Sequence, residues 1–184
     1  MIEDYSIKVI PYVCMCNGKE VVCYENGIPF SKAAEEFYTA MSKGAEVSTS
    51  LIPEERIAAQ FENSLKAEKD VLMITISSQI SGTNHQANNA ARELMKKYPE
   101  RRIYVIDSAN SGFGEGLLAV QAAKLRGMGE DVETCCKWLE NNKFKLNSYF
   151  TVADLKYLRK GGRISSAVAI AGTILNIKPI LKAD

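Results

Sequence analysis

The chain has 184 residues, of which 46% are hydrophobic and 24% are charged, as in ordinary globular domains. Its 23 Lys and Arg residues nearly balance its 22 Asp and Glu residues, which leaves a formal net charge of +1. This balance gives no basic field for a phosphate backbone, so nucleic-acid binding is not expected. No apolar run approaches the roughly 18 residues of a membrane span, and no secretory signal opens the sequence. We expect a cytoplasmic protein without stable membrane insertion.

The chain contains five cysteines. They are Cys14, Cys16, Cys23, Cys135 and Cys136. No second Cys-x-x-Cys or His-x-His pair accompanies them to complete a zinc site. We therefore expect no metal site, and reduced thiols that pack as small hydrophobic side chains.

A hairpin pattern opens the chain. The apolar, β-rich run 7–16 is followed by Asn17-Gly18, a strong two-residue turn signal, and by the returning run 21–24. We expect an edge or flap element here.

A helix, a loop and a second helix are predicted next. Pro29 opens the first helical pattern and Gly44 closes it. The polar run Ser48-Thr49-Ser50 predicts a loop, and Pro53 stands at the first position of an amphipathic helix. The apolar residues of that helix are spaced four apart: Ile57, Phe61 and Leu65.

Two βα units form the middle of the chain. The continuous apolar run 71–76 is typical of a parallel strand buried on both faces, and it leads through the polar loop 77–83 into a helix. The run 103–106 leads through the loop 107–116 into the apolar helix 117–125. Such alternation predicts an α/β fold, with a mostly parallel sheet and helices on both faces.

The remaining sequence continues this alternation. Asp131 predicts the N-cap of a further helix, and 149–152 predicts a strand. A helical stretch of small residues, 167–171, and a strand-like run, 175–181, follow.

Three polar loops precede helices, and two of them directly follow strands. They are Thr49-Ser50, 77–83 and 107–116. In an open α/β sheet such loops meet at the carboxyl ends of the strands, where ligands bind. Hydroxyls and amides at helix N-termini favour an anion, and because neither Thr49-Ser50 nor Ser81-Gly82-Thr83 has a cation nearby in sequence, we expect a carboxylate. The alternative is that these hydroxyls only cap their helices.

Other polar residues give weaker signals. His85, the single histidine, is expected to face solvent from a helix. Asp107 and Asp154 lack the phosphate loop or Asp-x-Asp cluster of a metal site, so we expect them to be caps or turn residues. The run Gly161-Gly162-Arg163 is either a tight turn with solvated charges or a basic patch that faces a partner.

Six motifs occur in one order along the chain. They are Thr49-Ser50, Ser77-Ser78-x-x-Ser81-Gly82-Thr83, Asp107-Ser108, Gly114-x-Gly116, Asp154-Leu155-x-Tyr157-Leu158-x-Lys160-Gly161-Gly162-Arg163-Ile164 and Leu175-Asn176-Ile177-Lys178-Pro179-Ile180-Leu181. Together they resemble the DegV family. The resemblance implies a two-domain α/β fold: an N-terminal lipid-binding domain over 1–152, lacking the family's usual first strand, and the truncated start of a second domain over 153–184.

The resemblance also implies a function. A long-chain fatty acid such as palmitate or oleate would lie buried between the domains, with its carboxylate on Thr49 and Ser81 and with Ser50, Gly82 and Thr83 in the same site. Such proteins present the acyl group to a fatty acid kinase, which forms the acyl phosphate for bacterial phospholipid metabolism. Arg163 would contact that partner or the phosphate. The chain itself would be a carrier without catalytic residues or cofactor.

Two alternatives stay open. One is a metal-dependent phosphoryl transferase or hydrolase of α/β fold that uses Asp107, Ser108 and Asp154, because fold alone does not establish function. The other is an interaction module that binds no small molecule.

Overall fold

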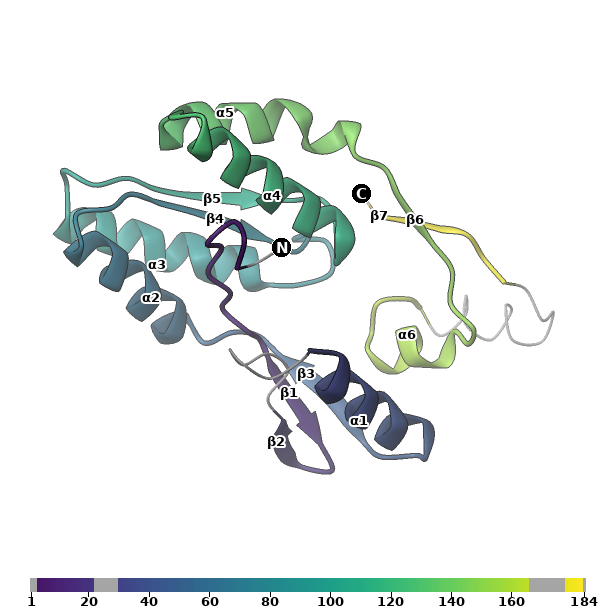
Figure 1. Ribbon diagram of the computed structural model, residues 1–184. Helices are drawn as coiled ribbons and strands as arrows, with labels where there is room; N and C mark the ends of the chain where they lie inside the picture. The colour runs from purple at the N-terminus through teal and green to yellow at the C-terminus, as the bar shows by residue number, and fades with distance from the viewer. Residues whose placement is uncertain (1–2, 22–29, 166–177, 184) are drawn as a thin grey trace.

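The computed structural model describes residues 3–21, 30–165 and 178–183 (Figure 1). The strands are β1 (Val13–Cys16), β2 (Lys19–Val21), β3 (Val47–Ser50), β4 (Val71–Thr75), β5 (Ile103–Asp107), β6 (Ser148–Phe150) and β7 (Leu181–Ala183). The helices are α1 (Phe30–Ser42), α2 (Glu54–Lys66), α3 (Thr83–Lys97), α4 (Phe113–Gly127), α5 (Val132–Asn142) and α6 (Lys156–Lys160), with a 3-10 turn η1 at Lys143–Lys145. The predicted stretch 167–171 lies outside the described residues, as do 22–24 and 175–177.

The centre of the molecule is the parallel pair β4–β5, in register from Val71↔Ile103 to Thr75↔Asp107. Helices α2 and α3 cover one face of this pair, and α4 and α5 cover the other (Figure 1). Strand side chains alternate between the two cores, because Met73 packs with α2 and α3 whereas Ile74 packs with α4 and α5. The predicted α/β fold with helices on both faces is confirmed. The other strand pairs within the described residues are antiparallel.

The core under α2 follows the predicted pattern. Ile57, Phe61 and Leu65 are each at most 3% exposed. On α3 the buried face is made of small residues such as Ala87 and Ala91, which let this helix approach α2 and the sheet closely. Burial of a side chain as large as that of Phe61 stabilises the fold by about 1.5–3 kcal/mol.

The predicted hairpin turn is confirmed. Asn17 and Gly18 have φ values of 50° and 75°, as a type I′ turn requires at both central residues. The turn joins β1 to β2, which pair from Cys14↔Val21 to Cys16↔Lys19.

The prediction of a loop at Ser48-Thr49-Ser50 is wrong, because these residues belong to β3. This strand pairs with the second edge of β1, from Val13↔Ser50 to Cys16↔Val47. The Asn17 amide donates to the Glu46 carbonyl at 2.8 Å, and the Glu46 amide donates to Asn17 Oδ1 at 2.9 Å. Pairing across the sheet therefore overrides the local polarity of the run.

The cysteines differ in state. Cys14 is disulfide-bonded, whereas Cys16, Cys135 and Cys136 are free thiols. The expectation of reduced thiols is therefore wrong at Cys14. Cys135 packs as expected, since it is 3% exposed, and burial raises the pKa of its thiol.

The last described elements lie beyond α5. Asp131 caps α5 as predicted, accepting the Thr134 amide at 2.7 Å. Strand β6 confirms the start of the predicted strand 149–152 and pairs with β7 from Ser148↔Ala183 to Phe150↔Leu181. None of the described helices is long and apolar enough to cross a membrane.

Candidate functional site

The loop between β4 and α3 is a compact turn built around Ser77. The carbonyl of this residue accepts the amides of Ile80 and Ser81, both at 3.2 Å, and its Oγ accepts the amide of Gln79 at 3.2 Å. Ser77 itself is 3% exposed. Its hydrogen bonds fix the backbone that carries Ser81.

Two hydroxyls lie together where this loop enters α3. Ser81 Oγ and Thr83 Oγ1 are 3.0 Å apart, and the Thr83 amide donates to Ser81 Oγ at 3.3 Å. Thr83 is the first residue of a 15-residue helix, whose N-terminus carries a partial positive charge. A carboxylate can replace the mutual hydrogen bond of the pair with one hydrogen bond from each hydroxyl. The predicted residues Ser81, Gly82 and Thr83 thus form a compact corner, called here the hydroxyl corner.

The end of β3 borders this corner. A Cβ added at Gly82 would lie 3.1 Å from Cδ1 of Leu51, so Leu51 packs against the backbone at Gly82. Thr49 and Ser50 are exposed at the end of β3. Because successive strand residues point to opposite faces, the hydroxyls of Thr49 and Ser50 point apart.

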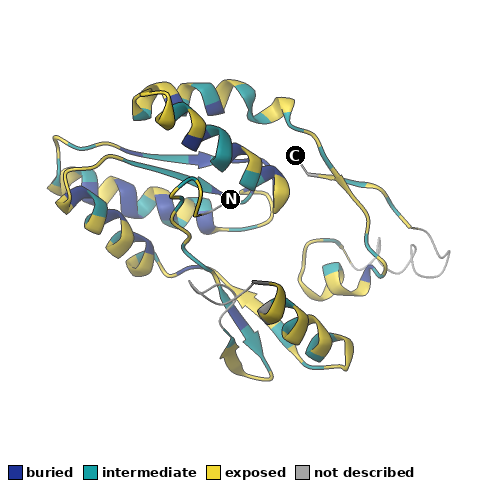
Figure 2. Ribbon diagram, in the orientation of Figure 1, coloured by how far each residue is buried: buried dark blue, intermediate teal, exposed yellow. Residues whose placement is uncertain are grey.

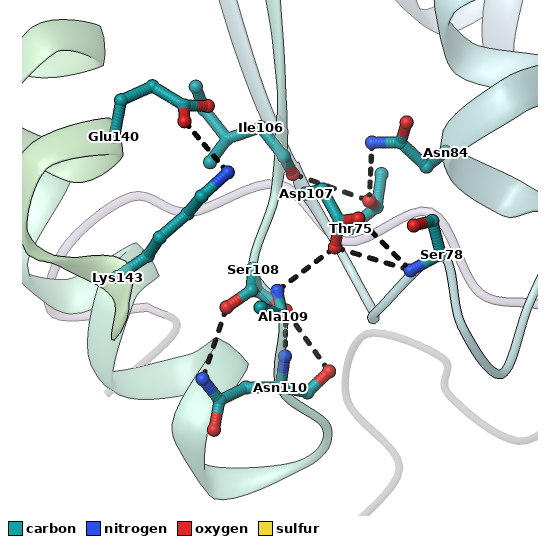
Figure 3. Close-up of polar contacts among 10 residues, drawn as sticks. All are labelled: Thr75, Ser78, Asn84, Ile106, Asp107, Ser108, Ala109, Asn110, Glu140 and Lys143. Atoms are coloured by element: carbon teal, nitrogen blue, oxygen red, sulfur yellow. Dashed lines mark hydrogen bonds and ion pairs between the residues drawn. The ribbon is translucent and has the colours of Figure 1, made fainter. Parts of the chain in front are cut away.

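Asp107, at the end of β5, holds two loops together. Its Oδ1 accepts the Ala109 amide at 2.9 Å, and both carboxylate oxygens lie 3.2 Å from the Ser78 amide (Figure 3). Asp154 similarly accepts the Lys156 amide at 2.8 Å, and its carboxylate is 3.0 Å from Lys156 Nζ. The prediction that Asp107 and Asp154 are cap or turn residues is confirmed.

A buried polar turn completes the corner behind Asp107. Ser108 Oγ donates to the Asn110 carbonyl, and the Asn110 amide donates back to Ser108 Oγ, both at 3.1 Å (Figure 3). The Asn110 carbonyl also accepts the Ser77 amide at 2.8 Å, and Asn110 Oδ1 accepts the Ser148 hydroxyl at 2.6 Å. Asn110 therefore connects the β4–α3 loop to β6.

Sequence reasoning missed Asn110 and Ser148. Their contacts join positions 38 residues apart in the chain, and neither residue lies in a motif that marks such a contact. One signal was present at Gly114: a Cβ there would lie 2.5 Å from Asn110 Oδ1 and 2.7 Å from Ser148 Oγ. A glycine inside a helix indicates such a close approach.

Arg163 reaches the hydroxyl corner from the turn that follows α6. Backbone hydrogen bonds close α6, including one from the Arg163 amide to the Leu158 carbonyl at 2.9 Å, and Gly162 has a φ of 73°. The predicted tight turn is therefore present. In addition, Arg163 Nε donates to the Ile80 carbonyl at 3.2 Å, directly before Ser81, while the side chain stays exposed.

A carboxyl group near the N-terminal segment is unusual in its burial. Glu115 lies in the first turn of α4, and desolvation raises its pKa to about 7. The pKa of the Tyr12 hydroxyl is also raised, by burial and then by neighbouring Tyr38 and Glu115. Sequence analysis did not predict this electrostatic interaction between α4 and the segment before β1.

The remaining candidates lie apart from the corner. His85 is exposed on α3, as predicted, with Nε2 3.4 Å from Asn89 Nδ2. Within 3–21, 30–165 and 178–183, no three His, Cys, Asp or Glu side chains gather as a metal site requires.

Comparison with known proteins identifies the family. The family model described as "Uncharacterised protein, DegV family" matches residues 1–184. The chain belongs to the DegV family. A DegV domain-containing protein of Clostridium perfringens is 35% identical over 181 residues, which cover 98% of this chain and 61% of that protein. Another, from Lactococcus lactis, is 37% identical over 145 residues, covering 79% of this chain and 50% of that protein.

Solved DegV structures share this fold. A structure titled as fatty acid binding of a DegV family protein from Thermus thermophilus has a TM-score of 0.80 and 29% identity, covering 100% of this chain and 62% of that chain. DegV of Bacillus subtilis, titled a fatty acid binding protein, has a TM-score of 0.78 and 32% identity over the same shares. The fatty acid kinase B3 protein of Streptococcus pneumoniae, loaded with linoleic acid, has a TM-score of 0.80 at 22% identity, covering 95% of this chain and 59% of that chain; it supports the fold alone.

Proposed function

We propose that this DegV chain holds the carboxylate of a long-chain fatty acid at Ser81 and Thr83, with Thr49 as a further hydroxyl donor and with Ser50 and Gly82 in the same corner. The observation that carries the proposal is the pair of hydroxyls 3.0 Å apart at the N-terminus of α3. Fatty-acid-binding proteins among the structural relatives support the choice of ligand.

The acyl chain provides most of the gross binding free energy in this proposal. Each buried methylene contributes about 0.8 kcal/mol, so a chain of more than ten methylenes contributes on the order of 10 kcal/mol. Ordering of the chain and desolvation of the carboxylate offset several kcal/mol of that gain. The expected result is firm binding that still allows exchange.

We further propose that the protein is a cytoplasmic carrier without stable membrane insertion, which presents its fatty acid to a kinase for acyl-phosphate formation. Its domains would be 1–152 and the segment from 153. Arg163 is the proposed contact with the phosphate or the partner. Its Nε donates to the Ile80 carbonyl beside Ser81 and its Nη1 donates to the Gly161 carbonyl, so Nη2 of the exposed guanidinium is the nitrogen that can receive a phosphate oxygen.

The alternative of a hydrolase or transferase that uses Ser108 is disfavoured by burial. Ser108 is 0% exposed, and its hydroxyl donates to the Asn110 carbonyl. Asp107 holds backbone amides instead of facing a separate ligand. A nucleophile at Ser108 would have to leave the turn that it stabilises.

Lipid extraction after native mass spectrometry tests the proposed ligand. We expect one long-chain fatty acid per chain, or loading by palmitate or oleate. Ser81→Ala removes a hydroxyl from a bound anion and should weaken fatty-acid binding about tenfold or more, since such a loss costs about 1.5–3 kcal/mol. Ser64→Ala, which removes a hydroxyl that donates to the Gln60 carbonyl within α2, is the matched control and should bind normally. Preparations that are empty and cannot be loaded would contradict the proposal.

Acyl-phosphate formation with an added fatty acid kinase tests the role of Arg163. Arg163→Ala should retain lipid yet fail to support this reaction. Arg163→Lys should support it poorly, because an ammonium group lacks the planar pair of donors with which a guanidinium binds phosphate. Arg92→Ala, at an exposed position of α3, is the control. Normal turnover by Arg163→Ala would remove this residue from the partner site.

A further inference from the structure

The loop that carries Ser81 is hydrogen-bonded at two positions to the end of β5 and the loop that follows it. The Ser77 amide donates to the Asn110 carbonyl at 2.8 Å, and the Ser78 amide donates to the Asp107 carboxylate at 3.2 Å. The first hydrogen bond joins two backbone groups. The second depends on the Asp107 side chain, so mutation of Asp107 can remove this hydrogen bond without changing the sequence of the β4–α3 loop.

We propose that Asp107 is the positioning residue of the hydroxyl corner, which holds the β4–α3 loop so that Ser81 and Thr83 point at the same ligand atoms. This inference rests on the proposed fatty-acid site and adds a residue to it. Asp107 does not touch the ligand itself; it acts through the backbone that presents the two hydroxyls.

The path from Asp107 to the hydroxyls is short and continuous. Its carboxylate fixes the Ser78 amide, and the adjacent Ser77 carbonyl accepts the Ser81 amide at 3.2 Å. Ser81 Oγ then accepts the Thr83 amide and meets Thr83 Oγ1. A displacement of Ser78 therefore changes the backbone on which Ser81 sits.

Both oxygens of the Asp107 carboxylate face backbone amides. Oδ1 serves the Ala109 amide at 2.9 Å and lies 3.2 Å from the Ser78 amide, while Oδ2 lies 3.2 Å from the same Ser78 amide. Ala109 has a φ of 50°, a left-handed conformation that a side chain disfavours, so this hydrogen bond offsets local strain. Asparagine keeps one acceptor oxygen but turns an N–H₂ group toward a donor. Asp107→Asn should therefore be a partial replacement.

The same strand pair supplies a matched control. At the opposite end of β4 and β5, Asp70 Oδ1 accepts the Arg102 amide at 2.8 Å. Asp70→Ala and Asp107→Ala remove the same chemical group from the same kind of contact. Only Asp107 adjoins the hydroxyl corner.

Amide NMR spectra of the chain without ligand test the positioning directly. Asp107→Ala should shift the amide resonances of Ser81 and Thr83 and speed their hydrogen exchange about tenfold, with a smaller change for Asp107→Asn. Asp70→Ala should leave both residues unchanged. Unaltered Ser81 and Thr83 amides in folded Asp107→Ala would overturn the proposal. This measurement needs no bound lipid, so it decides the role of Asp107 even if the proposed function fails.

A double-mutant cycle on binding separates positioning from a general loss of structure. Asp107→Ala should weaken palmitate binding about tenfold but change binding of methyl palmitate, which lacks the anion, less than about twofold. In a Ser81→Ala background, Asp107→Ala should have little further effect, because the two residues act as one unit. Equal losses for acid and ester, or additive losses in the cycle, would contradict positioning. A wild-type chain that binds neither compound would instead contradict the proposed function.

Discussion

The two sides of the proposed head-group site are supported in different ways. Ser81 and Thr83 lie where α3 meets the parallel pair β4–β5, a corner whose backbone is fixed by several hydrogen bonds. Thr49 and Ser50 lie at the end of β3, a strand of the antiparallel sheet whose residues are mostly exposed (Figure 2). In the proposed site, Ser81 and Thr83 would therefore set the geometry of anion binding, and the more exposed Thr49 and Ser50 would adjust to the ligand.

The largest expected effect comes from filling the fixed corner. In Gly114→Ala the new Cβ would lie 2.5 Å from Asn110 Oδ1 and 2.7 Å from Ser148 Oγ, so the buried turn must move. We expect a loss of about 1–3 kcal/mol in the free energy of unfolding, measured by urea denaturation.

Gly116→Ala is the matched control for that change. Nothing lies within 4 Å of a Cβ at Gly116, and alanine favours the helix by about 0.5–1 kcal/mol over glycine. This variant should be as stable as the parent chain or slightly more stable. Equal effects of the two substitutions would mean that the contact between α4 and β6 is loose.

A smaller change in the free energy of unfolding is expected for substitution of Glu115, where α4 meets the segment before β1. Burial raises the pKa of Glu115 from 4.5 to about 7, so folding binds a proton and stability falls as pH rises from about 4.5 through 7. Glu115→Gln removes this loss. After allowance for solvent screening, the variant should gain about 1–2 kcal/mol over the parent chain at pH 8, and little at pH 4.

Thermal denaturation at both pH values measures this difference. The direction of the pH dependence follows from the raised pKa. The stabilisation by the proton on Glu115 is fully present below pH 4.5 and is lost as pH rises through 7. A variant that gains stability equally at pH 4 and pH 8 would show that the carboxyl of Glu115 titrates normally.

The smallest effect on stability is expected on the exposed side of the site. Thr49→Ala and Ser50→Ala should each change the free energy of unfolding by less than about 0.5 kcal/mol, since both side chains are exposed. Their hydroxyls point to opposite faces of β3, so Thr49→Ala alone should weaken fatty-acid binding, by several-fold. Calorimetric titration with palmitate measures the difference. A larger loss in Ser50→Ala would place the ligand on the other face of β3.

Sequence periodicity predicted the elements whose environment is local. The four-residue spacing of Ile57, Phe61 and Leu65 determines the buried face of α2, and the apolar run from 71 matches β4. The residue pair Asn17-Gly18 likewise predicted the hairpin turn. In each case residues that are close in sequence determine the local structure.

Contacts between residues far apart in the sequence could not be predicted from local patterns. Strand β3 forms because β1 offers a free edge, which the polar sequence around Thr49 does not reveal. The hydrogen bond from Ser148 to Asn110 and the contact of Arg163 with the Ile80 carbonyl join residues 38 and 83 positions apart. The motifs indicated which hydroxyls to propose for the site, whereas the residues that hold those hydroxyls in place required the three-dimensional structure.

The pairing of β6 with β7 has a consequence for the order in which parts of the molecule open. This pair consists of short strands, and Tyr149 is 66% exposed and Phe150 41% exposed, so few buried contacts resist its separation. Local opening of such a pair requires less free energy than global unfolding. When β6 departs it takes Ser148 with it, and Asn110 loses the donor to its side-chain oxygen. We therefore expect opening of the β6–β7 pair to loosen Asn110, whose main-chain carbonyl accepts the amide of Ser77, four residues before Ser81.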